Sequence, residues 1–414
     1  MSLNITASQV PSAYSPILAQ SPIVFSVFSS ANASSSFYYT LDLRIWSGSR
    51  FDSGSAPRYS LIKYPNALGY GIFDISRFAN SSLTNLALQA TSSALWYTTT
   101  FNYNYQGGIS GSDIKLSGDP RDPLIDGYQL FPEAINQNVS SSTFYPLLTS
   151  GPSTQSVLIT DVGWGGIVTY MPGSEAGDGP NVSGSVDISY TGSYADGSTT
   201  LARKSMTIVS SSLNTSASIS WYPTAPQQPG FPLALTNNGY DLTSYSIRGG
   251  RQIVASPLRR VIGAEIKYNI VCPQYYDPIR IFWKNRFSQF DWLNFYLKST
   301  ETFDTVQRVY QPQLGTWNSS TLTYTGYQSA TQRYIVDALQ TITVNTGYLP
   351  ESYNEIMKQL LVTDEAYWMY DQPQNLVKPL TIKTNNLTFK TGVNDKLIQY
   401  TIAFDIGQPY KLII

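Results

Sequence analysis

The sequence predicts an all-β protein built from two or three antiparallel, jelly-roll-like β-sandwich units, with one short helix in the C-terminal region. Apolar and polar side chains alternate over most of the chain, which is the period of a strand with one buried face. The 414 residues exceed the ~100–200 residues typical of one domain. Several separate cores are therefore expected.

Residues 1–20 are polar and are predicted to form an extended N-terminal arm. The first β-sandwich is predicted over residues 21–152. Its strands begin where alternation begins, at Ile23, and the last clear one ends near Tyr105. One helical turn is expected around Phe78.

The end of this first unit, residues 106–152, is rich in Gly, Asp, Pro and Ser and is predicted to form long loops. Its acidic residues could bind calcium or supply the carboxylate pair of a hydrolase acting on polysaccharide. They are Asp113, Asp119, Asp122, Asp126 and Glu133. Asp before Pro or Gly is common in turns, so turns are the favoured interpretation and no cofactor is expected.

A β-rich middle domain is predicted over residues 153–220, where an Asp-Gly turn at Asp196 joins two alternating segments. Residues 221–235 contain four prolines and are predicted to form a linker outside any sheet. Trp221, Tyr222 and Phe231 are the aromatic residues that could hold this linker against a surface, and a flexible tether is the alternative.

Residues 236–414 are predicted to form a C-terminal β-domain. A helix is expected near residues 351–362, because Pro350 precedes an apolar stripe at helical spacing. Unbroken alternation over residues 398–406 predicts a terminal hairpin.

The segment "RIFWKNRFSQFDWLNFYLKS", residues 280–299, carries seven aromatic rings. It is predicted to be a hairpin whose rings point alternately into the core and outward toward a neighbouring chain. Trp283 and Trp292 are candidate structural or interface residues. Arg286 and Asp291 are predicted to form a charge-assisted clasp across the turn.

The composition excludes several kinds of chemistry. The chain has no histidine, so Ser-His-Asp, Cys-His and HExxH sites are impossible and no enzymatic activity is expected. Its single cysteine, Cys272, has apolar neighbours and is predicted to be buried and inert. The net charge of -1 disfavours direct nucleic-acid binding, and no apolar stretch approaches the ~18 residues needed for membrane insertion.

Tyrosine is abundant, with 31 copies, and suits both sheet cores and wet protein interfaces. Rings also stack on sugars, so a glycan-binding alternative is carried by Trp164 and Tyr105 in predicted loops.

Two segments resemble virion structural proteins of tailed bacteriophages. "PIRIFWKNRFSQFDWLNFYLKS" looks like the strand, Asn-Arg turn, Asp, strand element of tail-tip and baseplate proteins, particularly those of phages infecting Bacteroidetes. The run from "EIMKQLLVTDEAYWMY" to "DKLIQYTIAFDI" is similar to their closing helix, aromatic strand and final hairpin. The N-terminal "FYYTLDLRIWSGS" also resembles sandwich modules of such proteins.

This resemblance implies a structural subunit of the virion, in the tail or baseplate, that is assembled in the host bacterial cytoplasm. It implies homo-oligomerisation and contacts with other virion structural proteins, and it transfers no catalytic residues. A capsid or head-decoration protein is one alternative. An adsorption protein that binds a host receptor or glycan is another.

Overall fold

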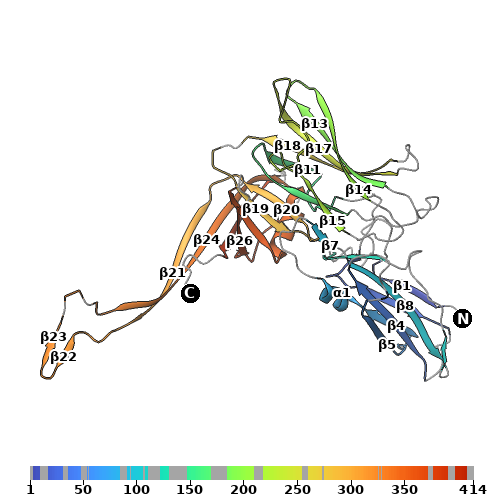
Figure 1. Ribbon diagram of the computed structural model, residues 1–414, viewed down its shortest axis with the longest axis horizontal. Coiled ribbons are helices and arrows are strands. Elements are labelled where there is room, and N and C mark those ends of the chain that lie inside the picture. The colour runs from blue at the N-terminus through green and yellow to red at the C-terminus, as the bar shows by residue number, and fades with distance from the viewer. Residues whose placement is uncertain are drawn as a thin grey trace. The chain divides into compact units, whose positions relative to one another are not determined.

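The computed structural model describes residues 3–9, 17–30, 36–47, 54, 56–83, 91–93, 95–105, 108–110, 122–129, 147–168, 184–208, 218–253, 260–272, 275–324, 326–327, 329–371, 376–389 and 397–407. The predicted all-β fold is confirmed (Figure 1). The chain divides into two compact units: unit 1 is Met1–Cys272 with Lys284–Asp291, and unit 2 is Pro273–Trp283 with Trp292–Ile414.

Unit 1 begins with two sheets that share one core. The smaller sheet has the order β1 (Asn4–Ala7), β3 (Val24–Phe28), β6 (Tyr70–Asp74). The larger has the order β2 (Ile17–Leu18), β10 (Asp122–Ile125), β8 (Leu95–Tyr105), β4 (Tyr38–Trp46), β5 (Arg58–Lys63), and β9 (Gly108–Ser110) pairs with β8. Alternate residues such as Phe25, Phe73, Leu41 and Phe101 are buried between them.

The described N-terminal residues belong to these sheets, so they do not form the extended arm expected from their polarity. Ala7 on β1 and both residues of β2 are buried, and β2 pairs in parallel with β10. A few apolar side chains at strand spacing are enough to hold this segment in the sheets. The expected helical turn around Phe78 is the helix α1 (Ser76–Ser82).

Unit 1 also contains a sheet rich in buried tyrosine. Its order is β11 (Thr154–Leu158), β18 (Arg260–Val271), β17 (Tyr240–Ile253), β13 (Gly184–Tyr194), β14 (Thr199–Ile208), with β16 (Thr236–Asn237) against β17. A smaller sheet has the order β12 (Trp164–Val168), β15 (Ser218–Pro223), β7 (Thr91–Ser93). The β13–β14 hairpin turns at Gly197, whose φ of 81° suits the predicted Asp-Gly turn.

The proline-rich stretch is only partly outside the sheets. Trp221, Tyr222 and Pro223 are the end of β15 and pair with β12, while the following residues leave the sheet. Cys272 is exposed, contrary to the expectation of a buried thiol, because it follows directly after the end of β18.

Unit 2 is organised around a seven-stranded antiparallel sheet. Its order is β20 (Phe290–Phe295), β19 (Ile279–Lys284), β25 (Ala366–Asp371), β26 (Leu376–Ile382), β27 (Leu397–Ile406), β24 (Gln332–Pro350), β21 (Thr300–Tyr310). The expected helix is confirmed as a 3-10 turn, η2 (Glu351–Tyr353), continued by α3 (Asn354–Val362). Ile356, Met357 and Leu360 of α3 are buried in the core with Tyr400 and Phe404 of β27.

β21 and β24 extend beyond this sheet as a two-stranded ribbon (Figure 1). β24 pairs with β27 only from Thr341 onward, whereas it pairs with β21 from Gln332 to Thr343. At the far end, β22 (Thr316–Asn318) and β23 (Thr321–Thr323) form a small hairpin. We call residues 300–340 the ribbon arm.

Candidate functional site

The β19–β20 hairpin contains most of the residues singled out in the sequence. All twelve residues of its two strands are buried, including Trp283 and Trp292. The expectation that every second ring points outward to a neighbouring chain is therefore wrong. The turn of this hairpin, Lys284–Asp291, groups with unit 1.

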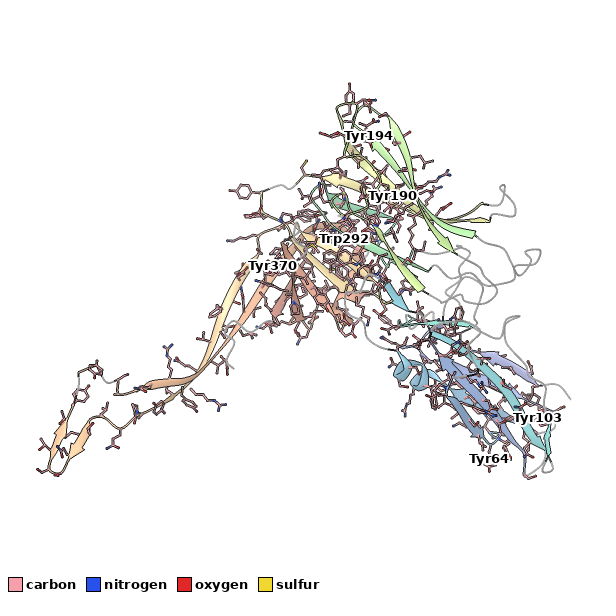
Figure 2. All side chains as sticks on the ribbon, viewed as in Figure 1. Tyr64, Tyr103, Tyr190, Tyr194, Trp292 and Tyr370 are labelled. Carbon is pink, nitrogen blue, oxygen red and sulfur yellow. The ribbon has the colours of Figure 1, made fainter. Side chains whose placement is uncertain are left out.

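A buried arginine lies between aromatic rings on this hairpin. The Arg280 guanidinium carbon is 3.7 Å from the centroid of the Trp292 ring, which Figure 2 labels, and 5.3 Å from that of Phe282. Its Nη1 donates a hydrogen bond of 3.1 Å to Oδ1 of Asn294. Cation–π attraction is strongest where water is excluded, so these rings offset part of the cost of burying the charge.

Asn285 fixes the shape of the turn. Its side-chain Oδ1 accepts hydrogen bonds from the backbone N–H groups of Phe287 and Gln289, at 2.9 and 3.1 Å. Its Nδ2 donates to the carbonyl of Leu148 at 3.0 Å. Ser288 has a φ of 58°, a left-handed conformation that these bonds help to hold.

An ion pair ties the turn to Asp126, the residue directly after β10. Lys284 Nζ is 2.9 Å from Oδ2 of Asp126, which also accepts a hydrogen bond of 2.7 Å from Ser288. Gln20 donates to the other carboxylate oxygen at 2.7 Å. Burial by itself raises the pKa of Asp126, but these donors and the Lys284 charge outweigh it, so the pKa lies below its usual value.

Asp291 is enclosed by donors from another loop of unit 1. Its carboxylate accepts hydrogen bonds from the Thr149 hydroxyl at 2.6 Å and from the Ser150 backbone N–H at 2.9 Å. Burial raises the pKa of Asp291, and these bonds, Asn285 and the charge of Arg286 only partly oppose it. The guanidinium carbon of Arg286 itself lies 4.6 Å from the centroid of the Phe287 ring.

The raised pKa of Asp291 gives a pH test with Asp291→Asn. Below the usual Asp pKa of ~3.9 the residue is protonated in both folded and unfolded chains. As pH rises toward the raised folded pKa, the unfolded chain loses the proton first, so stability falls. We expect the free energy of unfolding of the wild type minus that of the variant to decrease with pH from 3 to 7. Urea titrations measure it, and a difference that grows with pH would contradict this role.

Two tryptophans stack beside the turn. The rings of Trp164 and Trp221 are 5.2 Å apart and nearly parallel, and Trp221 Nε1 donates to Oε1 of Gln289 at 3.2 Å. The glycine cluster of β12 makes room here, because a Cβ on Gly166 would overlap the Gln289 amide. The cluster therefore serves close packing.

Gly166→Ala should displace the Gln289 side chain and break its bond to Trp221. We expect a loss of about 1–2 kcal/mol in the free energy of unfolding, together with a change in the near-UV circular dichroism of the tryptophan pair. Gly326→Ala is the matched control, since a Cβ there meets nothing within 4 Å. Equal effects of the two substitutions would refute the packing role of Gly166.

Tyr222 and Phe231 lie in the tyrosine-rich part of unit 1. Tyr222 is buried, and burial raises its pKa well above the usual value. Phe231 meets Tyr190 and Tyr245 edge to face, at 5.8 and 5.1 Å between centroids. The hydroxyls of these two tyrosines donate to the carbonyls of Pro223 and Thr224, so tyrosines anchor the proline-rich stretch. Tyr190 is labelled in Figure 2.

The acidic residues of the first unit give no metal centre that can be described. Asp113, Asp119 and Glu133 lie outside the described residues, and so does the side chain of Asp122. Asp126 is engaged by Lys284. Among the residues that the structure describes, no group of three or more His, Cys, Asp or Glu side chains could hold a metal ion.

The ribbon arm is a second candidate surface, and the sequence did not single it out. All eleven residues of β21 are exposed, and side chains stand out along the ribbon in Figure 2. Large apolar residues are among them and continue to the tip. They are Phe303, Val306, Val309, Tyr310, Leu314, Leu322, Tyr324, Tyr327, Tyr334 and Leu339.

No family model matches the chain, and no curated protein matches it in sequence. Within the described part of the chain, none of the helices has the length and apolar character needed to cross a lipid bilayer.

Proposed function

We propose that the chain is a structural subunit of a tailed-phage virion, in the tail or baseplate, which acts by assembling with copies of itself and with other virion proteins. The ribbon arm is the observation that carries this proposal. A pair of strands with no core of its own and many exposed apolar side chains is typical of a surface that becomes buried in an assembly.

The chemistry of the hairpin turn supports a structural role. Two of the carboxylates with shifted pKa values, Asp126 and Asp291, are held by contacts that tie the turn to the end of β10 and to residues 149–150. Such networks fix one geometry for the backbone around them. The sequence also contains no histidine to act as a general base near neutral pH.

The direct test is to find the chain in purified particles. Mass spectrometry of particles and cryo-electron microscopy should place it in a ring around the tail axis or in the baseplate. A copy number matching the capsid lattice would instead favour the capsid or head-decoration alternative. Absence from purified particles would refute the proposal.

One observation favours an adsorption protein that binds a host glycan. On the outer face of the β8–β4–β5 sheet, Asn104 Nδ2 donates to the hydroxyl of Tyr38 at 2.6 Å, and the rings of Tyr38 and Tyr64 are 6.1 Å apart. Tyr64 is exposed at this edge, as Figure 2 shows. Exposed rings beside amides suit sugar binding.

Of the two glycan candidates named from the sequence, only Trp164 has a described side chain. Trp164 is partly buried against Trp221, and the side chain of Tyr105 lies outside the described residues. An array of host surface polysaccharides should detect binding that Tyr64→Ala abolishes. No binding, or binding that the substitution leaves unchanged, removes this second function.

A further inference from the structure

We propose that the ribbon arm docks on a second copy of this chain and forms the main contact of its oligomer. This inference deepens the proposed function and rests on it, because it names the partner of the assembly surface.

The arm cannot draw its stability from its own two strands. Isolated two-stranded hairpins are at best marginally stable in water, and a third strand or a packed face is usually needed. In the part of the chain that the structure describes, residues 303–310 pair only with residues 332–340. A partner that covers the arm would supply the missing contacts.

The register shows that both faces of the arm carry apolar side chains. Directly opposed residues lie on the same face of an antiparallel pair. Phe303 is opposite Gln340 on one face, while Val306 is opposite Asp337 on the other. Leu339, opposite Asp304, shares the face of Val306. A partner must therefore enclose the ribbon or receive it in a groove.

The outer edges of the arm offer a further means of binding. The residues of β24 that precede Thr341 do not pair with β27, and β21 is the last strand of its sheet. Edges of this kind add strands from other chains through backbone hydrogen bonds.

The ribbon arm and the rest of the chain both have a net charge close to zero. The arm contains Glu301, Asp304 and Asp337 against Arg308 and Arg333, which is 2 − 3 = −1. The remaining chain has 26 − 2 = 24 basic and 27 − 3 = 24 acidic residues, a net charge of zero. A slightly acidic arm does not suit nucleic acid or an anionic membrane. The rest of the chain has a net charge of zero and does not repel the arm, which suits a second copy of this chain as the partner.

The size of the arm is sufficient for a stable contact. Eleven residues at ~3.3 Å each give a length of about 36 Å, and two strands at ~4.8 Å spacing give a width of about 10 Å. Both faces together present roughly 700 Å², so one seated arm would bury about 1,400 Å² counting both partners. A standard specific interface buries ~1,200–2,000 Å².

The test compares self-association of the full chain with that of two matched substitutions. Val306→Asp places a charge on the arm at a residue that is 67% exposed. Val362→Asp is the control, because Val362 is 68% exposed at the end of α3, outside the arm. In analytical ultracentrifugation we expect the Val306→Asp, Leu339→Asp double variant to need a protein concentration at least ~10-fold higher than the wild type for half of the chains to associate. Val362→Asp should leave it within about twofold, and all variants should keep wild-type circular dichroism.

A photo-crosslinking residue at Phe303 identifies the occupant. We expect a crosslinked product of two copies of this chain, mapped by mass spectrometry to peptides joining different copies. Association that survives both arm substitutions would overturn the docking proposal and leave the virion function standing. A wild-type chain that stays monomeric, or an arm that crosslinks only to other virion proteins in particles, would also overturn it without refuting incorporation into the virion.

Discussion

Replacement of Trp283 by alanine should lower the free energy of unfolding of unit 2 by about 3–5 kcal/mol. Trp283 is fully buried in the core of the seven-stranded sheet, together with Ile281, Phe295 and residues of α3. Its loss leaves a large cavity that the strands cannot close without moving. Guanidinium denaturation followed by circular dichroism measures the effect.

Two controls separate packing from other effects. Trp283→Phe should cost much less, because it keeps most of the volume, and the indole Nε1 has no hydrogen-bond partner among the described residues. Tyr327→Ala, at a residue 89% exposed, should change stability by less than ~0.5 kcal/mol. A Trp283→Phe loss as large as that of alanine would show that cavity formation is not the cause.

Asp126→Ala should destabilise unit 1 by about 2–3 kcal/mol at pH 7, since Lys284 would remain buried without its carboxylate. This value is below the ~3–5 kcal/mol of a fully buried pair because Asp126 keeps some contact with solvent. The pKa of Asp126 is lowered, so its contribution is present above the unfolded pKa of ~3.9 and is lost as pH falls through the folded pKa.

Urea unfolding at pH 7 and at pH 3 measures both effects of Asp126→Ala. The Asp126→Leu, Lys284→Met double variant should recover part of the loss, because no charge stays buried. Asp42→Ala is the control for an exposed pair, since its partner Arg58 is largely exposed, and it should have a much smaller effect. A loss at Asp126 no larger than at Asp42 would refute the importance of burial.

Local sequence patterns predicted the sheets, the helix near residues 351–362 and the β13–β14 hairpin. Each depends on spacing along a short segment, such as the apolar stripe of α3 or the Asp-Gly turn at Asp196 and Gly197. The domain boundaries proposed from composition within residues 1–272 stay predictions. The structure groups these residues in one unit.

The degree of burial could not be predicted from the same patterns. Alternation shows which residues share a face, and it does not show whether that face is covered. Both faces of β19 and β20 are buried, whereas β21, which follows directly in the chain, is exposed along its whole length. Whether a strand face is covered depends on segments far away in the sequence. Period-two alternation within one strand carries no information about those segments.

The hairpin turn shows the same limit for the candidate site. Its sequence predicted a clasp between Arg286 and Asp291 across the turn, whereas the hydrogen bonds described for the Asp291 carboxylate come from Thr149 and Ser150. The donors that hold the carboxylate, Thr149 and Ser150, lie more than a hundred residues earlier in the chain. The sequence around the turn gave no indication of these two donors.

The position of this turn in the chain sets an order of events during synthesis. Thr149 cannot donate its hydrogen bond to Asp291 until Asp291, 142 positions later, has been synthesised. At ~5–20 residues per second, a ribosome takes roughly 7–28 s to cover that distance. Unit 1 therefore stays incomplete until the first strand of unit 2 and the turn after it have been synthesised.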